Sequence, residues 1–129
     1  MSGLPRRVVL IGAAVAPVAA CSAANDKHNR APSAPAAGQV LAPVAEIPVG
    51  SGTIVGDTIV TQPATGVFHG FVARCTHAGC VLTEVIDAQI VCPCHGSKFD
   101  LDGAVVRGPA TQPLVPVEVS VKGTSVVAG

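Results

Sequence analysis

The chain has 129 residues, with eight basic and eight acidic side chains, and its three Phe are accompanied by no Tyr or Trp. Balanced charge and so few aromatic rings exclude a typical nucleic-acid binder, which presents a basic surface and stacking side chains. Once a targeting segment is subtracted, the length leaves room for one small domain, and a domain of that size usually needs a metal or a disulfide to support its core.

Residues 1–20 have the layout of an export signal. Arg6 and Arg7 precede an uncharged stretch that runs from Val8 to small residues just before Cys21. As a helix, these 13 residues would span about 20 Å, which is less than the roughly 30 Å of bilayer hydrocarbon. The sequence therefore favours a leader over a transmembrane anchor.

Two features of this leader resemble known bacterial export signals. The segment Val18-Ala19-Ala20-Cys21 resembles a lipobox, and the paired arginines followed by Val8-Val9-Leu10 resemble a twin-arginine signal. The resemblance implies that Cys21 is acylated and that the folded protein is exported. Lipidation would then hold the product at the membrane.

Residues 21–39 are rich in Ala, Pro and Ser and show no apolar period, so we expect a flexible tether that includes a solvated His28. Residues 40–129 form the predicted domain. Their short Val- and Ile-rich runs are separated by Gly, Pro and Asp, which predicts an all-β sandwich or barrel. The predicted strands are Thr53–Val55, Thr58–Gln62, Val67–Ala73, Leu82–Ile86 and Val115–Val121. Asp102-Gly103 predicts a two-residue hairpin turn.

Four of the five cysteines lie between positions 75 and 94, close to two of the four histidines. They form two loops, Cys75-Thr-His77-Ala-Gly-Cys80 and Cys92-Pro-Cys94-His95-Gly-Ser97. This clustering indicates a metal site, a disulfide, or both. The 14 residues between His77 and Cys92 allow one strand out and one back. We therefore expect both loop tips to face each other at one end of a sheet.

These two loops resemble the two cluster-binding boxes of the Rieske family. The resemblance implies an antiparallel β-sandwich with a small cluster-binding subdomain at about residues 74–110, and one 2Fe–2S cluster. Cys75 and Cys92 would ligate one iron, and His77 and His95 the other. Because neutral imidazoles replace two thiolates, the reduction potential is expected to be intermediate to high.

The same resemblance assigns roles to residues around the cluster. Cys80 and Cys94 match the disulfide of one branch of the family, which requires an oxidising compartment. Gly79 and Gly96 permit tight turns, and Pro109 belongs to a third loop that covers the cluster. Ser97 matches a serine that donates to a bridging sulfide. Phe99 stands where high-potential members carry a tyrosine that donates to a cysteine sulfur.

Three other kinds of site remain open from the residues alone. A structural zinc site could use two Cys and two His, but it would leave a matched pair of cysteines unexplained. A four-cysteine iron–sulfur site would leave both histidines idle. A purely disulfide-bonded framework would also give the histidines no role. His69 lies within a predicted strand, away from the cysteines, and is expected to be structural or at the surface.

The resemblance implies one-electron transfer at the outer face of the bacterial cytoplasmic membrane, with a quinol-oxidising complex or a cytochrome as redox partner. We identify no independent catalytic residue. The alternative is a Rieske subunit of an oxidoreductase of the cytochrome bc type or the arsenite-oxidase type. Ala78, where quinol-oxidising members usually carry leucine, weakens the case for direct quinol docking. A ferredoxin for a cytoplasmic dioxygenase is disfavoured by the export signal and by Cys80 and Cys94.

Overall fold

The computed structural model describes Gly12 and residues 30–129 of the chain. The predicted lipidation site Cys21 and His28 lie outside the described residues, as does all of the predicted export signal except Gly12. The described part is almost entirely β, with one short 3-10 helix, η1 (Val44–Glu46). None of its helices has the length and apolar character needed to cross a membrane.

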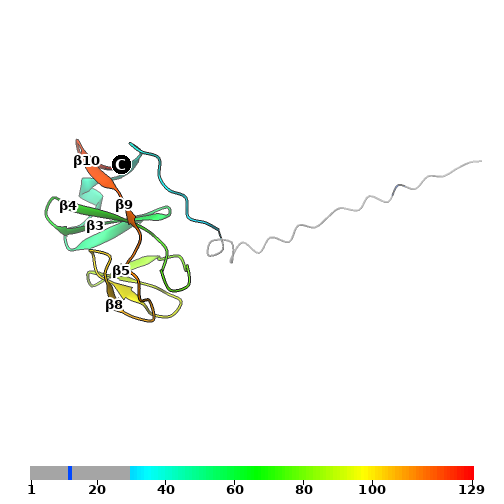
Figure 1. Ribbon diagram of the computed structural model, residues 1–129. Helices are drawn as coiled ribbons and strands as arrows, with labels where there is room; N and C mark the ends of the chain where they lie inside the picture. The colour runs from blue at the N-terminus through cyan, green and yellow to red at the C-terminus, as the bar shows by residue number, and fades with distance from the viewer. Residues whose placement is uncertain (1–11, 13–29) are drawn as a thin grey trace, which may run out of the picture.

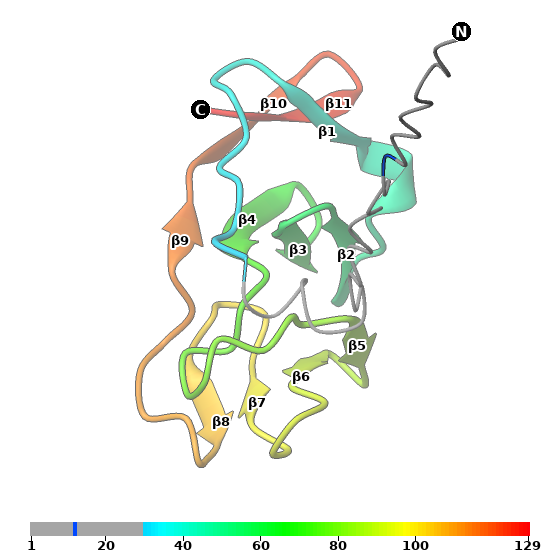
Figure 2. The same cartoon turned by 90° about the vertical axis from the view of Figure 1, so that its right-hand side faces the viewer.

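The strands form three antiparallel sheets, stacked along the long axis of the domain (Figures 1 and 2). The first, in the order β1-β11-β10, consists of β1 (Val40–Pro43), β11 (Ser125–Ala128) and β10 (Val119–Lys122). The middle sheet consists of β2 (Ser51–Val55), β3 (Thr58–Ala64), β4 (Val67–Val72) and β9 (Pro116–Val117). The third consists of β5 (Glu84–Ile86), β6 (Gln89–Val91), β7 (Lys98–Phe99) and β8 (Val105–Arg107).

The middle sheet is covered on both faces, because successive side chains of a strand point to opposite sides. On β3, Ile59 belongs to the core shared with the third sheet, and Val60 belongs to the core shared with the first sheet. Both side chains are fully buried. The structure therefore confirms the predicted all-β architecture of antiparallel sheets, with the third sheet packed on one face of the middle sheet.

The predicted run Val115–Val121 contains two strands that belong to different sheets. β9 pairs with β4 in the middle sheet, whereas β10 pairs with β11 in the first sheet. The chain changes sheets at Glu118, between the two strands. The alternation of Val117, Val119 and Val121 with polar residues continues through this point, so the pattern alone does not reveal the change of partner.

The hairpin predicted at Asp102-Gly103 is present, but its loop has three residues rather than two. The N–H of Gly103 donates to the carbonyl of Asp100, and the N–H of Asp100 donates to the carbonyl of Ala104. Gly103 has a φ of 83°, which is typical of a type I turn followed by a left-handed residue. The Asp100 carboxylate accepts from the N–H groups of Asp102 and Ala104, and this favours the longer turn.

Gly103 also lies where the hairpin of the third sheet touches the middle sheet. A Cβ added there would lie 2.5 Å from the ring of Phe71 on β4. We expect Gly103→Ala to lower the free energy of unfolding by about 1 kcal/mol for the left-handed backbone, and by at least about 1 kcal/mol more for overpacking. Gly66 has a φ of 79° but open space around it. Gly66→Ala should therefore show the cost of the left-handed backbone alone. Urea unfolding would measure both, and equal costs would contradict the packing argument.

Residues 30–39, which the sequence assigns to the tether, run along the side of the domain (Figure 2). Asp57 binds this segment twice: its carboxylate accepts from the N–H of Ser33 at 2.8 Å and lies 3.7 Å from the guanidinium of Arg30. Further along, the N–H of Gly38 donates to the carbonyl of Ala128. The part of the predicted tether that precedes Arg30 lies outside the described residues.

Candidate metal centre

Two cysteine-containing loops beside the third sheet repeat the same backbone turn. In loop 1 (residues 75–80) the N–H of Cys75 donates to the carbonyl of Cys80, and in loop 2 (residues 92–97) the N–H of Cys92 donates to the carbonyl of Ser97, both at 2.8 Å. The glycine in the fifth position of each loop donates back to the carbonyl of the first cysteine. These glycines, Gly79 and Gly96, have φ angles of 74° and 79°, which only glycine adopts readily.

The turns place sulfur and nitrogen donors in different environments. Cys75 and Cys92 are free thiols with 2% of their surface exposed. His77 and His95 are exposed, and their rings lie edge to face with centroids 5.0 Å apart. The predicted meeting of the two loop tips is therefore confirmed. Sulfur donors face the core, and imidazole donors face solvent.

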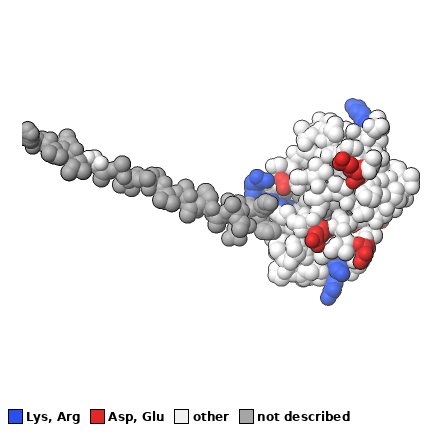
Figure 3. Space-filling view, turned by 180° about the vertical axis from the view of Figure 1, so that it is seen from behind, with Lys and Arg blue, Asp and Glu red and all other residues white. Residues whose placement is uncertain are grey.

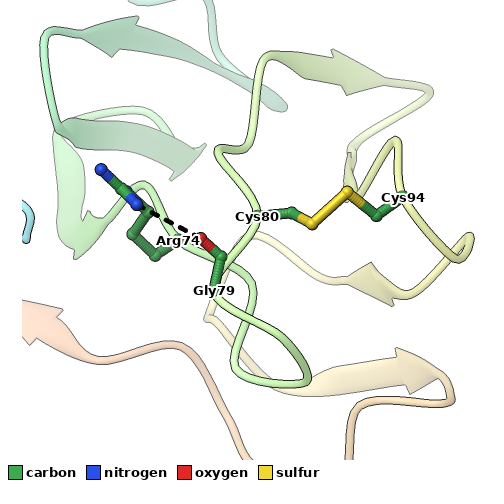
Figure 4. The surroundings of a disulfide bond; sticks show 4 residues. All are labelled: Arg74, Gly79, Cys80 and Cys94. Atoms are coloured by element: carbon green, nitrogen blue, oxygen red, sulfur yellow. Dashed lines mark hydrogen bonds between the residues drawn. A yellow bond between two sulfur atoms is a disulfide. The ribbon is translucent and has the colours of Figure 1, made fainter. Parts of the chain in front are cut away.

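A disulfide joins Cys80 to Cys94 and links the two loops, as predicted (Figure 4). The sulfur atoms of Cys80, Cys92 and Cys94 all lie within 4.8 Å of one another. Because Cys80 and Cys94 are bonded, a site with four free cysteines in these loops is excluded. Because Cys75 and Cys92 stay unpaired, a framework held only by disulfides does not describe the loops either.

Burial raises the pKa of the Cys92 thiol above its ordinary value, and the neighbouring Cys75 thiol raises it further. The backbone N–H groups of Cys94 and His95 act in the opposite direction, because they donate to the Cys92 sulfur and stabilise its thiolate. Burial therefore favours the neutral thiol at Cys92, and a bound metal ion would be needed to hold this side chain as a thiolate.

A third loop, residues 108–114, packs against the other two. The N–H of Ala110 donates to the hydroxyl oxygen of Ser97 at 3.0 Å, and the hydroxyl of Thr76 donates to the carbonyl of Gln112 at 2.6 Å. This loop contains Pro109, which follows a cis peptide bond. Ser97 is fully buried, and since its oxygen accepts from Ala110, its own proton remains available to a nearby acceptor.

The remaining predicted positions occupy distinct places. Phe99 on β7 is fully buried and belongs to the same core as Cys75 and Cys92. His69 on β4 lies 3.3 Å from the carboxylate of Asp102, which supports its structural role. Sequence reasoning missed Arg74 and the contacts of Thr76, because single residues beside a motif carry no periodic signal. Arg74 donates to the carbonyl of Gly79 at 3.3 Å (Figure 4).

The residues present fit a 2Fe–2S centre with mixed ligands. Two buried sulfur donors and two exposed nitrogen donors converge from two loops, and the disulfide holds the loops together. Such a centre takes two thiolates on one iron and two imidazoles on the other. The side chain of Ser97, buried beside the loops, offers a further hydrogen-bond donor.

Comparison with known proteins finds relatives among the iron–sulfur subunits of cytochrome b6-f complexes. The iron–sulfur subunit 2 of the cytochrome b6-f complex from Nostoc sp. PCC 7120 is 52% identical over 54 residues, which cover 41% of this chain and 30% of the relative. The corresponding subunit from Chlorobaculum thiosulfatiphilum is 34% identical over 86 residues, 64% of this chain and 48% of the relative. The chain thus spans less than half the length of these relatives.

Among solved structures, the plasma membrane Rieske protein PetC3 from Synechocystis PCC 6803 is 27% identical with a TM-score of 0.53, covering 62% of this chain and 86% of PetC3. The ferredoxin of carbazole 1,9a-dioxygenase from Nocardioides aromaticivorans IC177 is also 27% identical, with a TM-score of 0.55 over 75% of this chain and 98% of the ferredoxin. Residues 38–122 match the family model of the Rieske [2Fe-2S] domain. Since this match covers well over half of the chain, the protein belongs to the Rieske [2Fe-2S] domain family.

Proposed function

We propose that this protein transfers single electrons through a Rieske 2Fe–2S cluster held by Cys75, Cys92, His77 and His95. The membership in the Rieske family implies the cluster. The observation that carries the ligand assignment is the pairing of two buried free thiols with two exposed imidazoles on facing loops. When bound, the cluster supplies a centre that gains and loses one electron at a time.

The residues of the chain have separate tasks around this centre. The buried thiols of Cys75 and Cys92 sit where water is excluded, whereas His77 and His95 present their rings to an approaching partner. With the cluster bound, His77 and His95 would hold one of the two irons and, being exposed, would be the ligands that solvent and a redox partner can reach. The loops hold no other titratable side chain at their exposed tips.

The proposed place of action is the outer face of a bacterial membrane, with lipid on Cys21 as the anchor. The relatives include subunits of cytochrome b6-f complexes and a plasma membrane Rieske protein, which supports a redox partner at a membrane. The export features of residues 1–20 and the disulfide, which needs an oxidising compartment, agree with this. The face shown in Figure 3 carries scattered charges of both signs, so it offers no one-signed surface for electrostatic steering.

A stable subunit of a quinol-oxidising complex is the second candidate, because the curated relatives described above are such subunits. Ala78 at the tip of loop 1 is exposed and small, and so offers little surface for docking a quinol beside His77. Solubilising membranes in mild detergent and isolating the protein under native conditions separates the roles. A mobile carrier is recovered alone, and a subunit is recovered with a cytochrome.

The cofactor is tested by iron and acid-labile sulfide analysis together with EPR of the dithionite-reduced protein. We expect two irons and two sulfides per chain and a spectrum typical of mixed nitrogen and sulfur ligation. Purified protein that is colourless and binds only zinc would contradict the proposed function.

Phe99 provides a test of how the site sets its reduction potential. Phe99→Tyr places a hydroxyl in the core that contains Cys75 and Cys92, and a hydrogen bond from it to sulfur stabilises the reduced, more negative centre. We expect the midpoint potential to rise by tens of millivolts, given about 59 mV per tenfold change for a one-electron couple. Phe68→Tyr, in the other core, is the matched control and should leave the potential unchanged. A Phe99→Tyr variant with the wild-type potential would count against this assignment.

A further inference from the structure

Arg74 is the cationic side chain that lies against loop 1. It follows β4 and directly precedes Cys75, and its backbone forms an isolated antiparallel bridge with Val81 on the other side of the loop. Its guanidinium donates to the carbonyl of Gly79, near the other end of loop 1 (Figure 4). The side chain is partly buried, so its position is restricted and its charge is screened less than that of an exposed arginine.

The contacts of Gly79 connect this charge to the ligand cysteines. The N–H of Gly79 donates to the carbonyl of Cys75, and the next residue, Cys80, is bonded to loop 2 through the disulfide. The guanidinium is therefore held at the base of the loop that carries Cys75 and His77. At loop 2 the matching backbone pair is Val91 with Lys98, so the flanking cation there follows the loop instead of preceding its first cysteine.

Two other arginines of the domain, Arg30 and Arg107, are more exposed than Arg74. Arg30 lines the same cavity as Arg74 and Cys75, but its side chain is 69% exposed and pairs with Asp57. The Asp57 carboxylate is bound by Arg30 and by the N–H of Ser33. Arg107 on β8 is exposed, and no salt bridge or hydrogen bond of its side chain is found in the described part of the chain.

We propose that Arg74, oriented by the Gly79 carbonyl, raises the reduction potential of the centre by placing a fixed positive charge beside loop 1. This inference rests on the proposed function. Reduction adds one electron, supplied by the redox partner, and so adds one negative charge between the loops. A nearby fixed cation stabilises the reduced form more than the oxidised form. Arg74 itself gains and loses neither an electron nor a proton.

The experiment measures midpoint potentials of the cluster-loaded protein by EPR-monitored redox titration at low ionic strength. Arg74→Met removes charge and hydrogen bond, Arg74→Gln removes the charge but keeps a donor, and Arg74→Lys keeps the charge. We expect Arg74→Met and Arg74→Gln to lower the equilibrium constant for reduction by about threefold to tenfold. At about 59 mV per tenfold change, this lowers the midpoint potential by about 30 to 60 mV. Lys should retain most of the wild-type value, and the controls Arg107→Met and Arg30→Met should change it less than twofold.

The outcomes are distinguishable from a failure of the proposed function. If Arg74→Gln keeps a wild-type EPR spectrum and a constant within twofold of wild type, the inference is wrong and the cluster assignment stands. If Arg74→Lys lowers the equilibrium constant for reduction as much as Arg74→Gln does, the charge is not the cause of the change, and the inference is again wrong. Should Arg74→Met fail to fold, the comparison of Gln with Lys still decides. A wild-type protein without a reducible cluster would overturn the proposed function itself.

Discussion

Replacing His95 by alanine is expected to abolish the Rieske centre while leaving the domain folded. His95 is exposed at the tip of loop 2 and belongs to neither buried core, so the fold loses little from its removal. The proposed centre, in contrast, loses one of its four ligands, the imidazole that lies against that of His77. The purified variant should lack the visible absorption and EPR signal of the wild type, and should contain less than about a tenth of its iron, because the set of two thiolates and two imidazoles is no longer complete.

The matched control is His69→Ala. His69 is a histidine of the same domain, but it lies on β4 beside Asp102 and not on a loop. This control should retain the full cluster content and the wild-type EPR spectrum. Circular dichroism in the far ultraviolet should be the same for both variants. A His95→Ala protein that keeps two irons and an unchanged spectrum would contradict the ligand assignment.

Removing the disulfide in the double variant Cys80→Ser/Cys94→Ser should have the second large effect. The bond joins residues separated by 14 positions, and closing a loop of this size contributes about 3 kcal/mol to the free energy of unfolding. That is a large fraction of the stability of a small domain. The loops would also lose the covalent link that holds Cys75 and His77 opposite Cys92 and His95, so the variant should release its cluster faster.

Urea unfolding at a fixed cluster content measures the first effect, and the decay of visible absorption in a chelator measures the second. Wild-type protein treated with a strong reductant provides the control, and its stability should approach that of the double variant. A loss below about 1 kcal/mol would show that the disulfide adds little to what the hydrogen bonds of the third loop already provide.

Much of the candidate site could be predicted from the sequence, because its donors are encoded in two short loops. The spacing of Cys75 and His77, and of Cys92 and His95, can be read from the sequence itself, and the 14 residues between His77 and Cys92 leave room for a strand out and a strand back. The turn of that hairpin was not predictable from its residues. Asp87 and Ala88 both have positive φ, a conformation that usually calls for Asn or Gly.

The surroundings of the loops depend on residues far apart in the sequence. Ser97 receives its hydrogen bond from Ala110, 13 positions away, and Thr76 reaches Gln112, 36 positions away. Such contacts leave no local pattern, since each residue alone is compatible with many partners. The same reason hid the division of Val115–Val121 between two sheets.

The sequence by itself thus determined the kind of chemistry: the donor atoms, the pairing of Cys80 with Cys94 implied by resemblance, and a chain of short strands to carry them. Only the tertiary structure decided which donors are buried, how the third loop closes over them, and that Arg74 places a charge against loop 1. Donor identity is a property of single side chains. Burial and electrostatic environment are properties of everything packed around them, and they exist only once the three sheets have assembled.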